Sequence, residues 1–154
     1  MDELKAKIHK AQSEGDIASL YVLEAQAHEL FDDETLMAYY ANILDLALER
    51  LTNALENLDR LDMNEVQDFA TLRALYEYAI EHYSAGSATD ASALFEVIGG
   101  LSEDEVFNEA MKIHRSACDA KIPFDTFIEE YVDMDAVQEG GKFYIGVFVK
   151  SIGN

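Results

Sequence analysis

The sequence is short of both cysteine and proline, with one of each among 154 residues. With Cys118 alone no disulfide can form within the chain, which suits a reducing compartment such as the cytosol. The chain also lacks any run of about 18 apolar residues, the length that a membrane span requires. Its first residues, MDELKAKIHK, do not resemble a signal peptide. We therefore expect a cytoplasmic protein that does not contact the membrane.

Basic residues are scarce as well, because 11 Lys and Arg stand against 31 Asp and Glu and the formal net charge is -20. Such a surface repels the phosphates of nucleic acids and anionic membranes. The acidity can serve solubility alone, or it can attract a basic partner. We expect no direct nucleic-acid binding, and a partner protein that presents a basic or amphipathic segment.

The scarcity of proline favours helices, since proline disrupts the interior of a helix. Apolar residues recur at steps of three and four along much of the chain, as on the buried face of a helix. The pattern predicts an all-α fold, either a multi-helix bundle or a helical-repeat-like array, forming one domain over residues 1–154. The predicted helices cover residues 2–13, 16–31, 34–60, 64–85, 88–98, 103–120 and 124–138. The stripe of the third helix consists of Leu36, Tyr40, Ile43, Ala47, Leu51, Ala54, Leu58 and Leu61.

Several residues mark expected helix ends. Gly86 can adopt the left-handed conformation that closes a helix. The pair Gly99 and Gly100 is interpreted as a helix stop. Ser102 and Glu105 have the spacing of a capping box, in which each side chain bonds to the other's backbone N–H.

The C-terminal segment, residues 140–154, differs in composition from the rest. KFYIGVFVK, residues 142–150, is rich in aromatic and β-branched residues and predicts a short strand. Both of its faces are apolar or small, so the strand needs cover or a partner. Pairing with the same strand of a second chain would give a homodimer. The alternative is a local hairpin with residues 131–137.

Residues 75–98, LYEYAIEHYSAGSATDASALFEVI, resemble a tetratricopeptide repeat, a pair of antiparallel helices. The matching positions are Leu75 and Tyr78 (large), Ala79 and Ala91 (small), Gly86 (turn) and Phe95 (bulky). Ile98 and Glu103 depart from the pattern, and no clean second copy is present. The resemblance implies a peptide- or protein-binding scaffold, similar to small acidic helical chaperones of secretion systems. An ordinary helical hairpin is the alternative.

Candidate binding residues are Tyr76, Tyr83 and Phe95 on this hairpin. Tyrosine buries a ring while its hydroxyl stays hydrated, so such residues suit a peptide-binding groove. Packing in the core or at its boundary explains the same residues.

Candidate metal ligands are His28, Glu77, Glu81 and His82, since acids and histidines one helical turn apart can share a metal ion. Carboxylate-bridged metal bundles use an E-x-x-H spacing that this sequence lacks. His114 and Cys118, also one turn apart, are candidates for an activated thiol, but no third, orienting group accompanies them.

The sequence contains no phosphate-binding glycine loop, no dinucleotide fingerprint and no nucleophile elbow. The first hypothesis is therefore a non-enzymatic protein–protein interaction module, chaperone-like or adaptor-like, without a cofactor. One alternative is a metal- or cofactor-binding helical bundle. Another is an acidic mimic of nucleic acid.

Overall fold

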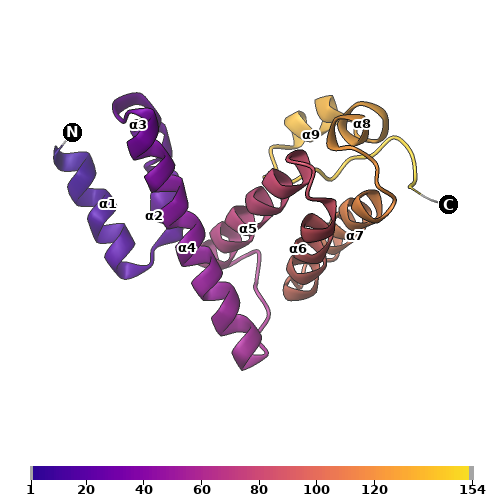
Figure 1. Ribbon diagram of the computed structural model, residues 1–154. Helices are drawn as coiled ribbons and strands as arrows, with labels where there is room; N and C mark the ends of the chain where they lie inside the picture. Colours follow the sequence, from indigo (N-terminus) through magenta and orange to yellow (C-terminus); the bar gives the residue numbers. More distant parts are fainter. Residues whose placement is uncertain (1, 153–154) are drawn as a thin grey trace. The chain divides into compact units, whose positions relative to one another are not determined.

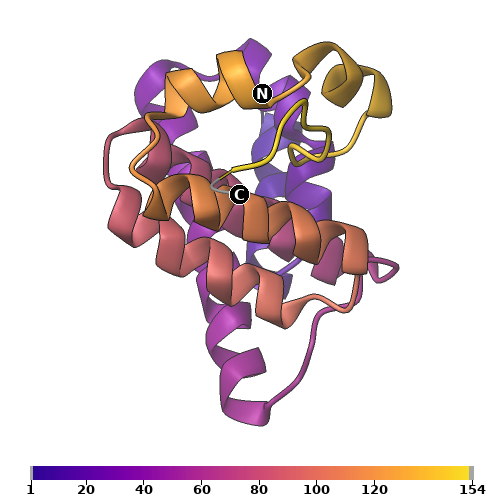
Figure 2. The same ribbon diagram turned by 90° about the vertical axis from the view of Figure 1, so that its right-hand side faces the viewer.

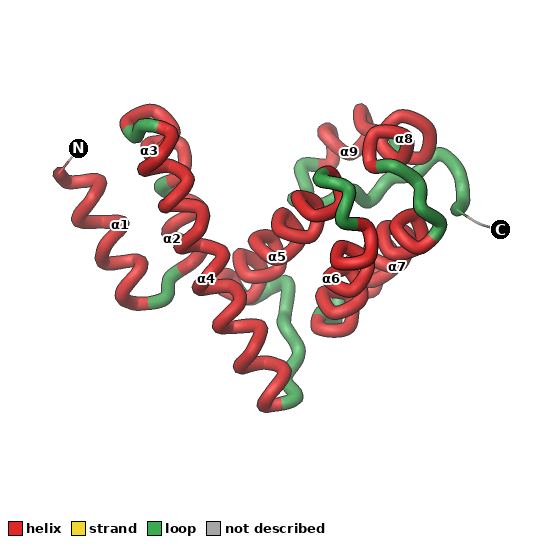
Figure 3. The backbone as a smooth tube through the Cα atoms, in the orientation of Figure 1, coloured by secondary structure: helices red, strands yellow, loops and turns green. Residues whose placement is uncertain are grey.

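A computed structural model describes residues 2–152, and its regular structure is helical (Figures 1 and 3). The predicted all-α class is confirmed. Contacts between residues divide the chain into two compact units, Met1–Ala74 and Leu75–Asn154. The division falls inside one helix, and the prediction of one domain over residues 1–154 stays a prediction. Within residues 2–152 no helix is both long and apolar enough to cross a membrane.

The first unit consists of four helices and the beginning of a fifth. In chain order these are α1 (Asp2–Glu14), α2 (Ile17–Val22), α3 (Glu24–Leu30), α4 (Asp33–Asn57) and α5 (Val66–Ser84). The short helix α2 contacts α1, α3 and α4, so it is the hub of this unit. The predicted helix over residues 16–31 is interrupted only at Leu23, which caps α2 and precedes α3.

Aspartates begin several of these helices by accepting the backbone N–H group three residues ahead. Asp16 caps α2, Asp32 caps α4, Asp104 caps α7 (Glu105–Asp119) and Asp133 caps α9 (Met134–Gly140). A carboxylate in this position satisfies a backbone donor and lies favourably at the positive end of the helix dipole. Part of the large acidic excess therefore has a structural role.

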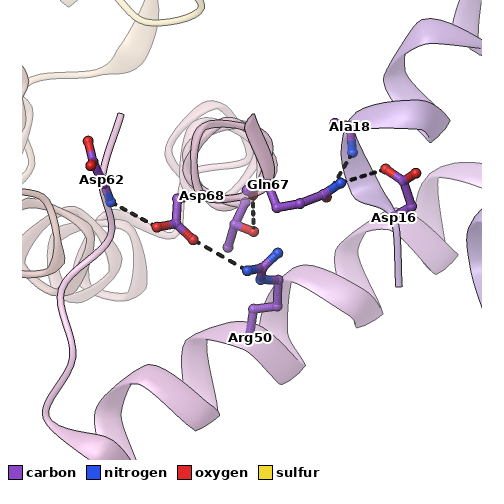
Figure 4. A network of polar contacts seen from close by, with 7 residues as sticks. Asp16, Ala18, Arg50, Asp62, Gln67 and Asp68 are labelled. Carbon is purple, nitrogen blue, oxygen red and sulfur yellow. Dashed lines mark hydrogen bonds and ion pairs between the residues drawn. The ribbon is translucent and has the colours of Figure 1, made fainter. Parts of the chain in front are cut away.

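Two side chains in the first turn of α5 fasten this helix to the rest of the first unit (Figure 4). The Gln67 amide accepts a hydrogen bond from the Ala18 N–H (3.2 Å) and donates one to the Asp16 carboxylate (2.6 Å). Asp68 forms an ion pair with Arg50 of α4 at 3.3 Å. The start of α5 is thus held from two sides by contacts between residues far apart in sequence.

The prediction for the third helix is wrong at its C-terminal end. The helix ends at Asn57, and Leu58 takes the left-handed conformation with φ of 56°. The N–H of Asp59 then bonds to the Ala54 carbonyl at 2.9 Å, a closure usually made with glycine. As a result Leu58 is 90% exposed, whereas Leu61 returns to the core.

The second unit consists of the remainder of α5, α6 (Ala88–Leu101), α7, α8 (Phe124–Thr126), a π-helical turn η1 (Phe127–Tyr131) and α9. Helices α6 and α7 lie side by side along their lengths (Figures 1 and 2). Pro123 precedes α8 as its N-cap, as its fixed φ and missing N–H lead one to expect.

The interpretation of Gly99 and Gly100 as a helix stop is wrong, because α6 continues through both glycines to Leu101. A Cβ on Gly99 would lie 3.2 Å from the Cβ of Met111, so glycine lets α7 approach α6 closely. The predicted capping box also differs from the structure. Asp104 caps α7, and the Ser102 hydroxyl accepts the N–H of Asp104 at 3.0 Å.

The expected strand over residues 142–150 is reduced to an isolated antiparallel bridge between Val132 and Phe148. The segment otherwise runs as an irregular loop (Figure 3). Val132 is extended (φ −109°, ψ 140°), and it breaks the predicted helix over residues 124–138 into η1 and α9. The tail therefore finds a local partner near Val132, in the region that the hairpin alternative named, instead of forming a full strand.

The tetratricopeptide resemblance stays a prediction. Within its 24 residues the structure places one helix, a turn at Gly86 with φ of 90°, and the next helix. Ala79 and Ala91 are both completely buried, as small residues at a helix contact must be. The rings of Tyr76 and Phe95 lie 6.1 Å apart and join α5 to α6.

Replacing Ala91 by leucine should destabilise the second unit. The side chain has no exposed surface, and added methylenes in a close-packed site cost about 1–3 kcal/mol. Urea denaturation of Ala91→Leu would measure the loss. Ala93→Leu, at an exposed position of the same helix, is the matched control and should be nearly neutral. Equal stability of the two variants would contradict a tight helix contact at Ala91.

Candidate functional site

The three predicted binding residues lie in the core of the second unit. Tyr76, Tyr83 and Phe95 are all buried, so they do not line a surface that a partner can reach. The Tyr83 hydroxyl donates to the Ile122 carbonyl at 2.7 Å, and burial raises the pKa of this phenol. The packing alternative therefore describes these aromatic residues correctly.

Tyr76 belongs to a buried hydrogen-bond chain. Its hydroxyl lies 2.8 Å from Nε2 of His114 on α7, and it accepts the N–H of Ile145 at 3.1 Å. The other ring nitrogen of His114, Nδ1, lies 2.6 Å from the carbonyl oxygen of Ala110. The chain joins α5, α7 and the C-terminal tail within the second unit.

The partners determine where the protons are. A carbonyl can only accept, so Nδ1 of His114 carries the proton and donates to Ala110. Nε2 is then the acceptor for the Tyr76 hydroxyl, whose oxygen still accepts from Ile145. Every polar group in this hydrogen-bond chain has a partner, and the arrangement requires that the imidazole be neutral.

Four aromatic rings surround much of the His114 imidazole. Complete burial lowers its pKa from 6.5 to about 4, and the hydrogen bond to Ala110 opposes this shift only in part. The rings within about 6 Å of the imidazole are those of Tyr76, Phe95, Phe127 and Phe148. Among the described residues no carboxylate offsets the cost of charging this buried imidazole, and the only opposing influence on its pKa is the hydrogen bond to Ala110.

Cys118 is not activated by His114. Both nitrogens of His114 are engaged with other groups, as described above. The thiol is buried, and burial raises its pKa to about 11. Cys118 is therefore a protonated, packed side chain at neutral pH, which does not fit the activated-thiol alternative.

The candidate metal ligands have other neighbours. In the first unit His28 is exposed, and its Nε2 lies 2.6 Å from the Tyr40 hydroxyl, which also donates to Glu24. In the second unit the ring of His82 lies 4.6 Å from that of Tyr78. Glu77 and Glu81 are exposed on the same helix. Within the described part of the chain, no group of three or more His, Cys, Asp or Glu residues gathers as a metal site requires.

The first unit presents apolar side chains among carboxylates where α3 ends and α4 begins. We call residues 29–37 the acidic corner. Leu30 is 44% exposed and Met37 is 73% exposed. The carboxylates of Glu29, Asp33 and Glu34 are exposed beside them in the sequence. This segment was not among the predicted sites, although its run of acids between two pairs of apolar residues is visible in the sequence.

The second unit has a groove of about 450 Å³ between α7 and the tail, which we call the tail groove. Its residues from α7 are Lys112, Ile113 and Ser116, and its residues from the tail are Phe148, Val149, Lys150, Ser151 and Ile152. Two of the five basic residues in this unit therefore line one groove of a strongly acidic chain. No sequence motif indicated it, because its two sides are more than 30 residues apart.

The buried imidazole predicts a specific dependence of stability on pH. The pKa of His114 is lower in the folded state than in the unfolded state, so the unfolded chain binds more protons below about pH 6.5. The stabilisation is complete above pH 6.5 and is lost as the pH falls towards 4. The loss should amount to about 3 kcal/mol.

His114→Gln removes the titration and is the comparison variant. The free energy of unfolding of the natural protein should fall more steeply between pH 7 and pH 4 than that of the variant, since the carboxylates contribute to both. An NMR titration of the His114 ring reports the same pKa directly. Parallel pH profiles, or a ring that titrates near 6.5, would contradict the sealed, neutral imidazole.

Comparison with known proteins adds no further assignment to this geometry. No family model matches the chain, and no curated protein and no solved structure shows significant similarity to it. Function is therefore inferred from the residues and contacts of the two units themselves.

Proposed function

We propose that the protein is a non-enzymatic interaction module that binds a basic, amphipathic segment of a partner protein at the acidic corner. The observation that carries the proposal is the exposure of Leu30 and Met37 among carboxylates. A charged surface alone would serve solubility. Large apolar side chains within such a surface contribute favourable binding free energy when a partner covers them.

The local geometry supports this reading. Met37 follows Asp33 and Glu34 by four and three residues on α4, so the three side chains share one helix face. Methionine is flexible and adapts to irregular apolar partners. A partner helix can place apolar residues on Leu30 and Met37 while its Lys or Arg residues meet the carboxylates.

The two residues best suited to nucleophilic catalysis are buried, and this favours a binding function over a catalytic one. His114 is sealed in the core with both nitrogens engaged, and Cys118 is a buried thiol of raised pKa. A tetratricopeptide-like scaffold formed by α5 and α6 is part of the same proposal, since repeats of this kind bind peptides or proteins. Nucleic-acid mimicry is the competing proposal. It would use the carboxylates without the apolar side chains.

A synthetic amphipathic helix of lysine and leucine, labelled with a fluorophore, tests the proposal by fluorescence anisotropy. Met37→Gln keeps the charge and removes an apolar contact, so the affinity should fall about tenfold, as for the loss of about 1.4 kcal/mol. Leu55→Gln changes another exposed apolar residue of α4 far from the corner and is the matched control. It should leave the affinity within about twofold.

Salt separates the two proposals. Electrostatic mimicry predicts that binding disappears in high salt and that Met37→Gln and Leu55→Gln behave alike. Apolar binding at the acidic corner predicts residual affinity in high salt and a persistent difference between the two variants. Equal affinities of both variants at every salt concentration would exclude the corner as the binding site.

A further inference from the structure

The tail groove of the second unit is lined by basic side chains, in contrast to the acidic corner of the first unit. In the tail groove, Lys112 and Lys150 stand beside the apolar side chains of Ile113, Val149 and Ile152. The Lys112 ammonium is paired with Glu109 at 3.2 Å, but both side chains are largely exposed, so this pair is weak. The Lys150 ammonium lies 4.3 Å from the centre of the Tyr131 ring. Both cations can turn towards a ligand at little cost.

The backbone of the tail offers hydrogen-bonding groups as well. The Val149 N–H donates to the Tyr131 carbonyl at 2.8 Å, and the Val147 carbonyl accepts from Asp133 at 3.1 Å. These two bonds flank the bridge at Phe148, whose own N–H and C=O consequently point away from residues 131–133. This opposite edge of the extended tail can pair with another strand.

From this geometry we infer that the tail groove binds an extended peptide segment with acidic side chains, which adds as a strand to the free edge at Phe148. The added strand would bond to the backbone of Phe148, and main-chain bonds of this kind supply affinity that does not depend on sequence. Acidic side chains on one face of the strand would meet Lys112 and Lys150. Apolar side chains on the other face would cover Ile113 and Ile152.

Charge decides between this occupant and a second copy of the chain. Self-pairing of two tails would offer Lys112 and Lys150 no carboxylate, because residues 142–152 contain none. Electrostatic complementarity across an interface selects between possible partners. An acidic strand from another protein instead neutralises Lys112 and Lys150. The groove therefore favours a foreign acidic strand over the homodimer that the tail sequence suggests.

The probe is a labelled, end-blocked peptide of alternating glutamate and valine, titrated into the full chain at low salt. Lys112→Gln and Lys150→Gln should each weaken binding about three- to fivefold, the effect of an exposed charge pair. Lys121→Gln removes an exposed lysine of the same unit that does not line the groove, and it should leave binding unchanged. In an NMR spectrum the amide of Phe148 should shift on binding.

A second peptide tests the strand geometry. The same sequence with every backbone nitrogen methylated keeps every charge but cannot donate main-chain hydrogen bonds, and it should bind at least tenfold more weakly. Equal binding of the two peptides would overturn strand addition. An equal loss in Lys121→Gln would overturn the groove as the site, and so would a chain that dimerises through the tail and fails to bind the peptide. Because the acidic corner is not involved, Met37→Gln should bind this peptide normally whether or not the proposed function holds.

Discussion

The buried chain from Ile145 through Tyr76 and His114 to Ala110 is the interaction on which the second unit depends. Through it α5, α7 and the irregular tail are joined by hydrogen bonds inside an aromatic core. In such surroundings an unpaired polar group costs more free energy than a hydrogen bond returns, so all members must be satisfied together. This requirement selects one tautomer of His114 and one position for the tail.

The same constraint gives the tail groove its shape. The N–H of Ile145 is anchored on the Tyr76 hydroxyl, and three residues further on Phe148 pairs with Val132. One edge of the tail is used by this short pairing, and the other remains beside α7. The extended tail therefore lines one side of the tail groove, which contains two of the five basic residues of the second unit.

Acidic residues have at least two roles in this chain. Asp16, Asp32, Asp104 and Asp133 begin helices, where a carboxylate satisfies backbone donors. Glu29 and Glu34 have no capping role in the structure and stand beside exposed apolar side chains at the acidic corner. The net charge alone does not distinguish capping acids from acids that stand beside exposed apolar side chains. The local geometry of α4 makes this distinction. If both proposals hold, the acidic corner and the tail groove give the chain two surfaces that prefer partners of opposite charge.

Sequence alone determined the helical class, most helix positions and the turn at Gly86, because helix periodicity and caps depend on residues within one or two turns. Only the tertiary structure decided that α6 continues through Gly99, that Leu58 is exposed and that Val132 breaks a helix. It also decided that Tyr76, Tyr83 and Phe95 form the core and not a binding surface. Several of these outcomes depend on contacts between residues more than ten positions apart, such as Gly99 against Met111 and Val132 against Phe148. No local pattern encodes which of many distant partners a side chain will meet.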